Sequence, residues 1–244
     1  MKLSEGIITK SIKYQETSKI ITILTNEGLS NYYVKGGAKY KSKNFSYSNE
    51  LTKIGFDFSE KNQDSLKILT SGTIINNYSN LKQSFDKLND CFLIMELINT
   101  LGKQISDYEI LYNFLDDILT IIDERPYSAY YLIVFRLKLL YLLGVGPIFS
   151  RCVNCDEKDD LVGFAFEYGG MCCKRCASGM ELLNNDLTNL IKFLYLVKLE
   201  NLDHELVMKL ESDTSLIGKF LDSYYEHFLG FRSKASKVIE KLRK

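Results

Sequence analysis

The sequence lacks several features that would each assign the protein to a definite class. It has no run of about 18 consecutive apolar residues, which excludes an ordinary membrane-spanning helix. Its N-terminal stretch, MKLSEGIITK, lacks the apolar run of a secretory signal peptide. Hydrophobic residues make up 45% and charged residues 25% of the 244 positions, which excludes a wholly disordered or a collagen-like chain. We therefore expect a cytosolic globular protein with room for one large domain or two smaller ones.

The sequence also lacks the common catalytic signatures. Of its two histidines, His204 and His227, neither lies in a metalloprotease or nuclease motif. The patterns G-x-S-x-G, G-x-x-x-x-G-K-[ST] and G-x-G-x-x-G are absent. Neighbouring acids such as Asp116 and Asp117 point about 100° apart on a helix, so they indicate a solvated face and not a metal-binding pair. We expect a protein that is not an enzyme.

A net charge of zero conceals a segregation of charge along the chain. Residues 1–79 carry 11 basic and 7 acidic side chains, a balance of +4. Residues 80–228 carry 14 and 23, a balance of −9, and residues 229–244 carry 6 and 1, a balance of +5. Basic ends suit a polyanionic partner such as nucleic acid, although chance distribution of surface charge explains the totals equally well.

The N-terminal segment 1–79 has the residue pattern of short β-strands separated by turns. Five stretches are rich in β-branched and aromatic residues, at 6–13, 19–25, 29–35, 51–59 and 66–75. Five strands in so short a segment favour a small closed barrel, which leaves no exposed sheet edge. A five-stranded OB-fold barrel fits best, and an SH3-like barrel or a small open sheet fits the same pattern.

Beyond residue 79 the apolar spacing becomes helical, with one interruption. Apolar residues recur at steps of three and four over 78–143, and again over 182–199, 204–210 and 215–229. Arg125-Pro126 and Gly144–Pro147 separate helices. The sequence therefore predicts an α+β protein with an OB-fold domain at 1–79, a helical domain at 80–150 and 182–244, and an insertion at 151–181.

The insertion contains two pairs of cysteines with the spacing of a metal site. A pair at Cys152 and Cys155 is followed, beyond the segment 156–172, by a pair at Cys173 and Cys176. Two thiolates from each of two turns complete a tetrahedral site for one zinc ion, and no position stays open for water. We expect a structural Zn²⁺ site, with redox-active thiols or a disulfide as the weaker alternatives.

Two further cysteines are interpreted differently. Cys172 adjoins Cys173, and neighbouring residues rarely point at the same ion, so Cys172 is taken as a bystander that could at most replace Cys173. Cys91 lies in an apolar helical stretch, where a small buried thiol is expected.

A basic loop follows the third predicted strand. Residues 34–47 contain no acid, and their lysines are interleaved with Tyr40, Phe45 and Tyr47. Lysines neutralise phosphates and aromatic rings stack on unpaired bases, so the loop predicts nucleic-acid binding, and a solvated flexible loop is the alternative. The candidate DNA-binding residues of the loop are Lys35, Lys39, Lys41, Lys43 and Tyr40.

A second basic segment lies at the C-terminal end of the sequence. A helix is predicted over 233–242, and its cations would either extend the DNA-binding surface or simply be solvated near the helix end. The candidate residues here are Arg232, Lys234 and Lys237.

These features, in this order, resemble the RecO family of bacterial recombination mediators. The resemblance spans the whole chain. Besides the cysteines it rests on the opening strands, the lysine-rich loop 35–43, the segment 142–147 leading to Arg151-Cys152, Gly169-Gly170 before the second cysteine pair, and the ending 225–230 followed by Lys234.

The resemblance implies a non-catalytic DNA repair protein. Members of the family have an OB domain, a helical domain and, in many cases, a zinc-binding insertion whose ligands match the four paired cysteines. They bind single- and double-stranded DNA, anneal complementary strands and engage the single-strand-binding protein. With RecR they help to load RecA onto coated strands. A nucleoid-associated protein of the cytoplasm is thus expected. The family's DNA contacts match the four loop lysines in character, although lysine in place of arginine weakens the case for bidentate phosphate contacts.

Three other functions are compatible with the same residues. An OB and zinc-ribbon module could act on RNA or in transcription, a scaffold could bind proteins alone, and a nuclease could act with a divalent metal. Oligomeric state, the RecR contact surface and the groove for the single-strand-binding protein's tail are not specified by the sequence.

Overall fold

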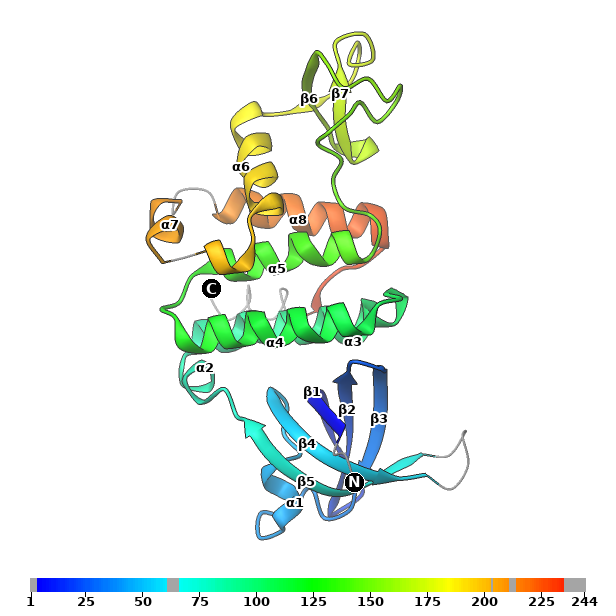
Figure 1. Ribbon diagram of the computed structural model, residues 1–244, viewed down its shortest axis with the longest axis vertical. Helices are drawn as coiled ribbons and strands as arrows, with labels where there is room; N and C mark the ends of the chain where they lie inside the picture. Colours follow the sequence, from blue (N-terminus) through cyan, green and yellow to red (C-terminus); the bar gives the residue numbers. More distant parts are fainter. Residues whose placement is uncertain (1–3, 61–65, 203, 211–213, 235–244) are drawn as a thin grey trace. The chain divides into compact units, whose positions relative to one another are not determined.

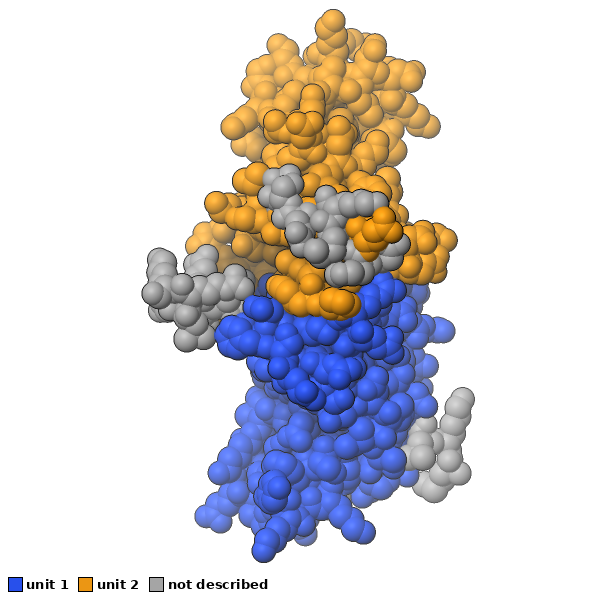
Figure 2. All heavy atoms as spheres, turned by 90° about the vertical axis from the view of Figure 1, so that its left-hand side faces the viewer, with its two compact units in different colours: residues 1–125 blue, residues 126–244 orange. Residues whose placement is uncertain are grey.

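The computed structural model describes residues 4–60, 66–202, 204–210 and 214–234. The chain forms two compact units, Met1–Arg125 and Pro126–Lys244 (Figures 1 and 2). The helices that follow the barrel, as far as Arg125, thus belong to the same unit as the barrel.

Five strands form a closed barrel in the first unit. The strand order around the barrel is β1-β2-β3-β5-β4, and every pairing is antiparallel except that of β3 with β5. The short helix α1 (Lys43–Ser46) lies between β3 and β4. This arrangement is the OB fold, so the prediction is confirmed and the open sheet is excluded. The strands are β1 (Ser4–Tyr14), β2 (Ser18–Thr25), β3 (Gly28–Val34), β4 (Thr52–Ser59) and β5 (Lys67–Asn76).

Alternation along the strands fills the barrel with apolar side chains. Successive residues of a strand face opposite sides, so every second residue points inward. Burying these branched and aromatic side chains is the main favourable contribution to folding of the barrel, at about 1.5–3 kcal/mol for each large side chain. The core of the barrel is one cluster of buried residues, of which all but Tyr47 come from the strands: Ile8, Ile21, Ile23, Tyr32, Val34, Tyr47, Ile54, Phe56 and Leu69.

Helices of the first unit begin and end at capping residues that the sequence supplies. The Asp107 side chain accepts a hydrogen bond of 3.0 Å from the Ile110 amide at the start of α4, and α4 ends at Glu124, shortly before Pro126. The elements are α2 (Ser79–Gln83), α3 (Phe85–Leu101), the 3-10 turn η1 (Gly102–Gln104) and α4 (Tyr108–Glu124). The helical pattern predicted from residue 78 onward is confirmed for this region.

Polar contacts attach these helices to the barrel. Asn99 of α3 and Thr9 of β1 exchange two hydrogen bonds of 2.8 Å each. Asp116 of α4 forms an ion pair of 2.6 Å with Lys53 of β4 and accepts a hydrogen bond of 2.8 Å from the Tyr78 hydroxyl. The interpretation of Asp116 as part of a solvated face is therefore wrong, because helical geometry turns it toward the barrel, whereas Asp117 is exposed.

The second unit combines helices with a small sheet. Strands pair in the order β7-β6-β8. Strands β6 and β7 form a hairpin around a 3-10 turn, with Gly169 in the left-handed region at φ 70°. The elements are α5 (Ala129–Leu142), β6 (Leu161–Ala165), η2 (Phe166–Tyr168), β7 (Gly170–Cys173), β8 (Leu182–Leu183), α6 (Asn185–Leu196), η3 (Leu199–Asn201), α7 (His204–Lys209) and α8 (Thr214–Leu229).

Helix α5 is the buried centre of this unit. Its Arg136 side chain, 7% exposed, forms an ion pair of 2.6 Å with Asp222 of α8. The Tyr225 hydroxyl donates a hydrogen bond of 2.8 Å to the Arg136 carbonyl oxygen. These contacts join segments that lie far apart in the sequence, so the helices on either side of the cysteine-containing insertion form one body. Among the described residues, no helix is long and apolar enough to span a membrane.

Candidate functional site

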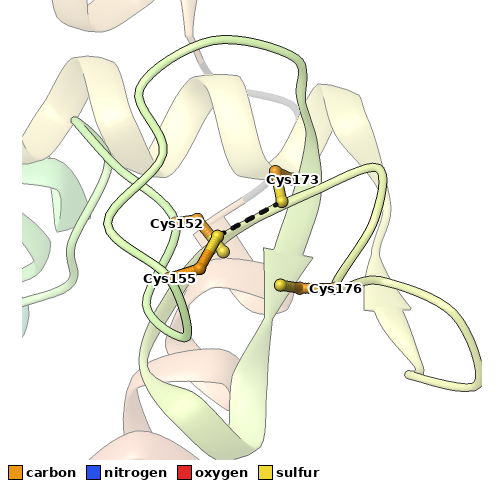
Figure 3. Close-up of side chains that lie close together, drawn as sticks. All are labelled: Cys152, Cys155, Cys173 and Cys176. Atoms are coloured by element: carbon orange, nitrogen blue, oxygen red, sulfur yellow. Dashed lines mark hydrogen bonds between the residues drawn. The ribbon is translucent and has the colours of Figure 1, made fainter.

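Four cysteine side chains converge in the second unit. The Sγ atoms of Cys152, Cys155, Cys173 and Cys176 all lie within 4.8 Å of one another, and those of Cys155 and Cys173 are 3.6 Å apart (Figure 3). The first pair comes from the segment before β6, and the second from the end of β7 and the turn after it. The predicted gathering of the paired cysteines is confirmed.

Each pair lies in a tight turn that brings its two thiols together. The Asp156 amide donates to the Cys152 carbonyl oxygen, and the Cys176 amide donates to the Cys173 carbonyl oxygen, each at 3.0 Å. The Val153 amide donates a hydrogen bond of 2.9 Å to the Met171 carbonyl oxygen of β7. This contact fixes the first turn beside the strand that leads into the second, so two pairs that are separated in the sequence reach one point.

Backbone amides around the site favour thiolates. Hydrogen bonding from the backbone of Cys173, aided by Asn154 and Cys155, lowers the pKa of the Cys152 thiol to about 6. The backbone of Cys176 likewise lowers the pKa of Cys173. At Cys155 the backbone hydrogen bond from Glu157 acts in the same direction, but hydrogen bonds with the Cys176 and Cys173 side chains outweigh it and raise the pKa to about 12.

Four thiolates whose sulfur atoms lie so close together repel one another, so the cluster needs a compensating positive charge. A bound metal ion removes that conflict, because it takes thiolates as ligands and compensates their charge. The residues present therefore fit a tetrahedral metal ion bound by four thiolates.

The remaining two cysteines lie outside the cluster. Cys172 is buried, and its thiol donates to the Met180 sulfur at 3.6 Å. Cys172 belongs to the small buried core beside the site, together with Cys152, Ala165 and Cys173. Cys91 is buried on α3 in the first unit, where burial raises the pKa of its thiol.

The basic loop after β3 is held by hydrogen bonds to neighbouring segments and within itself. The Ala38 amide donates a hydrogen bond of 2.9 Å to the Thr17 carbonyl oxygen in the turn between β1 and β2. Asn44 donates from its side chain to the Lys35 carbonyl oxygen at 2.8 Å, and Gly36 turns the chain at φ 72°. The loop thus consists of hydrogen-bonded turns and helix α1, which speaks against the alternative of a flexible solvated loop. All four candidate lysines, Lys35, Lys39, Lys41 and Lys43, are exposed.

The three aromatic residues of this loop differ in accessibility. Tyr40 is 85% exposed, and its ring centroid lies 5.5 Å from that of Phe45. Phe45 is half-buried beneath the Lys19 ammonium group, 5.1 Å from its ring centroid. Tyr47 is 6% exposed and packs in the barrel core, where only glycine at position 72 leaves room for its ring. The expectation that Tyr47 offers a stacking surface is therefore wrong.

Lys19 of β2 also lies beside this basic loop, although the sequence pattern did not indicate it. Its ammonium group donates a hydrogen bond of 2.7 Å to the Asn49 side chain as well as lying over Phe45. The contact between the turn at Thr17 and the loop at Ala38 brings it there. Spacing in the sequence gives no sign of that contact, because strands β2 and β3 lie between the two segments.

The C-terminal basic residues are only partly described. Arg232 and Lys234 are exposed, and Arg232 forms an ion pair with Glu226 of α8 that offsets its charge. Lys237 and most of the predicted helix 233–242 lie outside the described residues.

Comparison with known proteins covers both parts of the chain. The family model described as "Recombination protein O N terminal" matches residues 1–78, and that described as "Recombination protein O C terminal" matches residues 82–237. A DNA repair protein RecO of Listeria monocytogenes is 26% identical over 246 aligned residues, covering 100% of this chain and 96% of its own.

Two relatives from other genera agree. The DNA repair protein RecO of Halalkalibacterium halodurans is 24% identical and covers 98% of this chain and 94% of its own, and that of an Exiguobacterium species is 24% identical, covering 97% and 94%. The two matched family models together span almost the entire chain, from the barrel to the end of the described helices. The chain therefore belongs to the RecO family of DNA repair proteins.

Proposed function

We propose that this protein is a recombination mediator that binds single- and double-stranded DNA and anneals complementary strands. Together with RecR it would help to load RecA onto strands coated with single-strand-binding protein. The observation that carries the proposal is the exposed lysine cluster Lys35, Lys39, Lys41 and Lys43 on an OB barrel in a member of the RecO family.

Annealing of this kind needs no covalent chemistry from the protein. Two strands repel each other through their phosphates, and a lysine-rich surface lowers that repulsion by replacing condensed counterions. Base pairing then supplies the driving force. We accordingly propose a protein that is not an enzyme and acts in the cytoplasm at the nucleoid.

The metal ion at the four cysteines is proposed to be one Zn²⁺ with a structural role. Four thiolates satisfy the tetrahedral preference of zinc, and a site in which every ligand is a protein side chain has no position for substrate or water. Its role would be to hold the segment around β6 and β7 in one conformation, since that segment has only a small apolar core of its own.

A second candidate function rests on the same two features. An OB barrel and a zinc-binding segment would also suit a module that binds RNA or serves as a protein scaffold outside recombination. An RNA-binding protein can read the 2′-hydroxyl, so equal or tighter binding to an RNA strand of the same sequence would favour that candidate.

The test is annealing of two complementary oligonucleotides in the absence of ATP. One strand carries a donor and the other an acceptor fluorophore, and both are used naked and coated with the cognate single-strand-binding protein. We expect acceleration of at least tenfold over the spontaneous rate, weakened by salt, with both strands intact in magnesium or manganese. No acceleration at low salt by folded, metal-loaded protein would contradict the proposal, and loss of the strands would indicate a nuclease.

A further inference from the structure

The four-cysteine site has a buried side and a side that faces solvent. Cys152 and Cys173 are buried, at 0% and 2% exposed, whereas Cys155 is exposed and Cys176 is half-buried. A small reagent dissolved in water can therefore reach Cys155 while the segment stays folded. The two cysteines outside the site offer no such access, because both are fully buried.

A guanidinium group lies beside the exposed thiol. Arg175 belongs to the turn between the two cysteines of the second pair, and its charge interacts with the sulfur atoms of Cys155 and Cys173. Its ion pair with Glu157 is long, at 3.8 Å, and the Arg175 side chain is 78% exposed. A cation in this position favours thiolates and can donate hydrogen bonds to an oxygen atom that approaches them.

The exposed thiol also has a second sulfur atom close to it. The Sγ atoms of Cys155 and Cys173 are 3.6 Å apart, the pair joined in Figure 3. Sulfur atoms in a disulfide are about 2.05 Å apart, so these two need to approach by only about 1.5 Å. The two residues belong to different turns, and the backbone hydrogen bond of 2.9 Å between Val153 and Met171 keeps those turns side by side.

We propose that Cys155 and Cys173 form a thiol pair that hydroperoxides oxidise, with release of the bound metal ion. Its exposure opens Cys155 to the oxidant, Arg175 holds the oxidant there, and Cys173 supplies the second sulfur. The proposal goes beyond DNA binding and rests on the metal ion proposed above. It assigns an oxidative modification site to the segment around β6 and β7.

The reaction consists of two substitutions. The Cys155 thiolate attacks one oxygen of hydrogen peroxide and the O–O bond breaks, which gives a sulfenic acid and a hydroxide ion that takes a proton to form water. The Cys173 thiolate then attacks the Cys155 sulfur, the S–O bond breaks, and a second hydroxide leaves as water. Two thiolates, one peroxide and two protons thus give one disulfide and two waters, so sulfur is oxidised and oxygen is reduced.

Oxidation removes two of the four ligands at the metal site. The thiols that remain, Cys152 and Cys176, do not complete a tetrahedral site, so the ion leaves. Arg175 acts earlier, because its guanidinium donates hydrogen bonds to the peroxide and stabilises the negative charge on the departing oxygen. A dithiol reductant reverses the change, since it reduces the disulfide and restores both ligands.

The first experiment follows metal release from the intact, zinc-loaded protein. Hydrogen peroxide is added in the presence of a chromogenic zinc chelator, and the cysteines are then alkylated and mapped by mass spectrometry. We expect release of the zinc, a disulfide between Cys155 and Cys173, and renewed zinc binding after reduction with dithiothreitol. Retention of zinc in excess peroxide, or a disulfide in any other pair, would overturn the proposal while leaving the metal site intact. A purified chain that takes up no zinc would contradict the metal site and this proposal with it.

The second experiment tests the part of Arg175. The variant Arg175→Gln removes its charge, and Lys174→Gln removes the neighbouring exposed cation of the same turn, so the two variants have equal net charge and keep every ligand. Loss of a hydrogen bond to a charged group changes a rate by roughly tenfold. Peroxide should therefore release zinc roughly tenfold more slowly from Arg175→Gln than from the wild type, and within about twofold of the wild-type rate from Lys174→Gln.

A control without peroxide separates reactivity from a loosened site. Loss of zinc to the chelator alone should be equal for the wild type and both variants, because neither substitution removes a ligand. Equal rates of release by peroxide from Arg175→Gln and Lys174→Gln, at equal zinc content, would overturn the role assigned to Arg175.

Discussion

Replacing Cys173 with serine is expected to release the bound metal ion and to unfold the segment that contains β6 and β7. Cys173 supplies one of four converging thiols, and it also packs in the small core beside Cys152 and Ala165. A structural metal site is absent from the unfolded chain, so metal binding and folding of such a segment are one process. Removal of one ligand is therefore expected to abolish both metal binding and the folding of this segment.

Metal analysis and limited proteolysis test this expectation. The wild type should hold one ion per chain, and Cys173→Ser none, with cleavage between residues 150 and 180 faster by about tenfold or more. The matched control is Cys172→Ala, the neighbouring buried cysteine whose thiol faces Met180, and it should retain the ion. Retention of metal by Cys173→Ser and loss by Cys172→Ala would show that the ligand assignment is wrong.

The second large effect concerns the lysines of the barrel. Changing Lys35, Lys39, Lys41 and Lys43 together to alanine should flatten the salt dependence of single-strand binding. Each phosphate contact contributes about −0.7 to the slope of log affinity against log salt, so four contacts contribute about −3. Wild-type affinity should fall roughly fiftyfold between about 50 and 200 mM salt, and that of the variant far less.

Fluorescence anisotropy with an oligothymidylate at several salt concentrations measures both slopes. The matched control changes four exposed lysines of the second unit, Lys158, Lys192, Lys198 and Lys219, to alanine. This control alters the net charge equally and should keep the wild-type slope. Equal slopes for wild type and the barrel variant would instead assign these lysines to solubility.

Much of the fold could be predicted because local patterns and tertiary structure agree. The strand segments are rich in β-branched residues with alternating burial, and the predicted ranges differ only slightly from the observed ones at most ends. Helix α4 could also be predicted from the sequence, because Asp107 caps its first turn and Pro126 follows its end. The cysteine pairs could be assigned from spacing, because each C-x-x-C forms its own turn.

What could not be predicted depends on contacts between distant segments. Asp116 belongs to an apparently solvated acidic pair, but Lys53 and Tyr78 become its partners only when α4 lies against the barrel. Tyr78 adopts a left-handed conformation at φ 44°, which no propensity predicts for tyrosine.

The positions of aromatic residues on the barrel also depend on contacts that the sequence alone does not predict. The loop pattern alone gives Tyr40, Phe45 and Tyr47 equal weight, yet Tyr47 fills space left by Gly72 inside the barrel. Conversely, Tyr14 and Tyr33 lie in different strands and become neighbours only through the register of β1, β2 and β3. Alternation in each strand marks them as outward-facing, but the pairing is needed to bring them together.

A lysine acetylation footprint tests most directly whether the barrel binds DNA. The protein is treated briefly with an acetylating reagent, with and without a saturating oligothymidylate, and the modification of each lysine is read by mass spectrometry. The proposed function predicts that Lys35, Lys39, Lys41 and Lys43 lose most of their reactivity on binding DNA, while Lys174 and Lys192 of the second unit keep theirs. Protection of Lys174 and Lys192 with unchanged reactivity of the barrel lysines would contradict it.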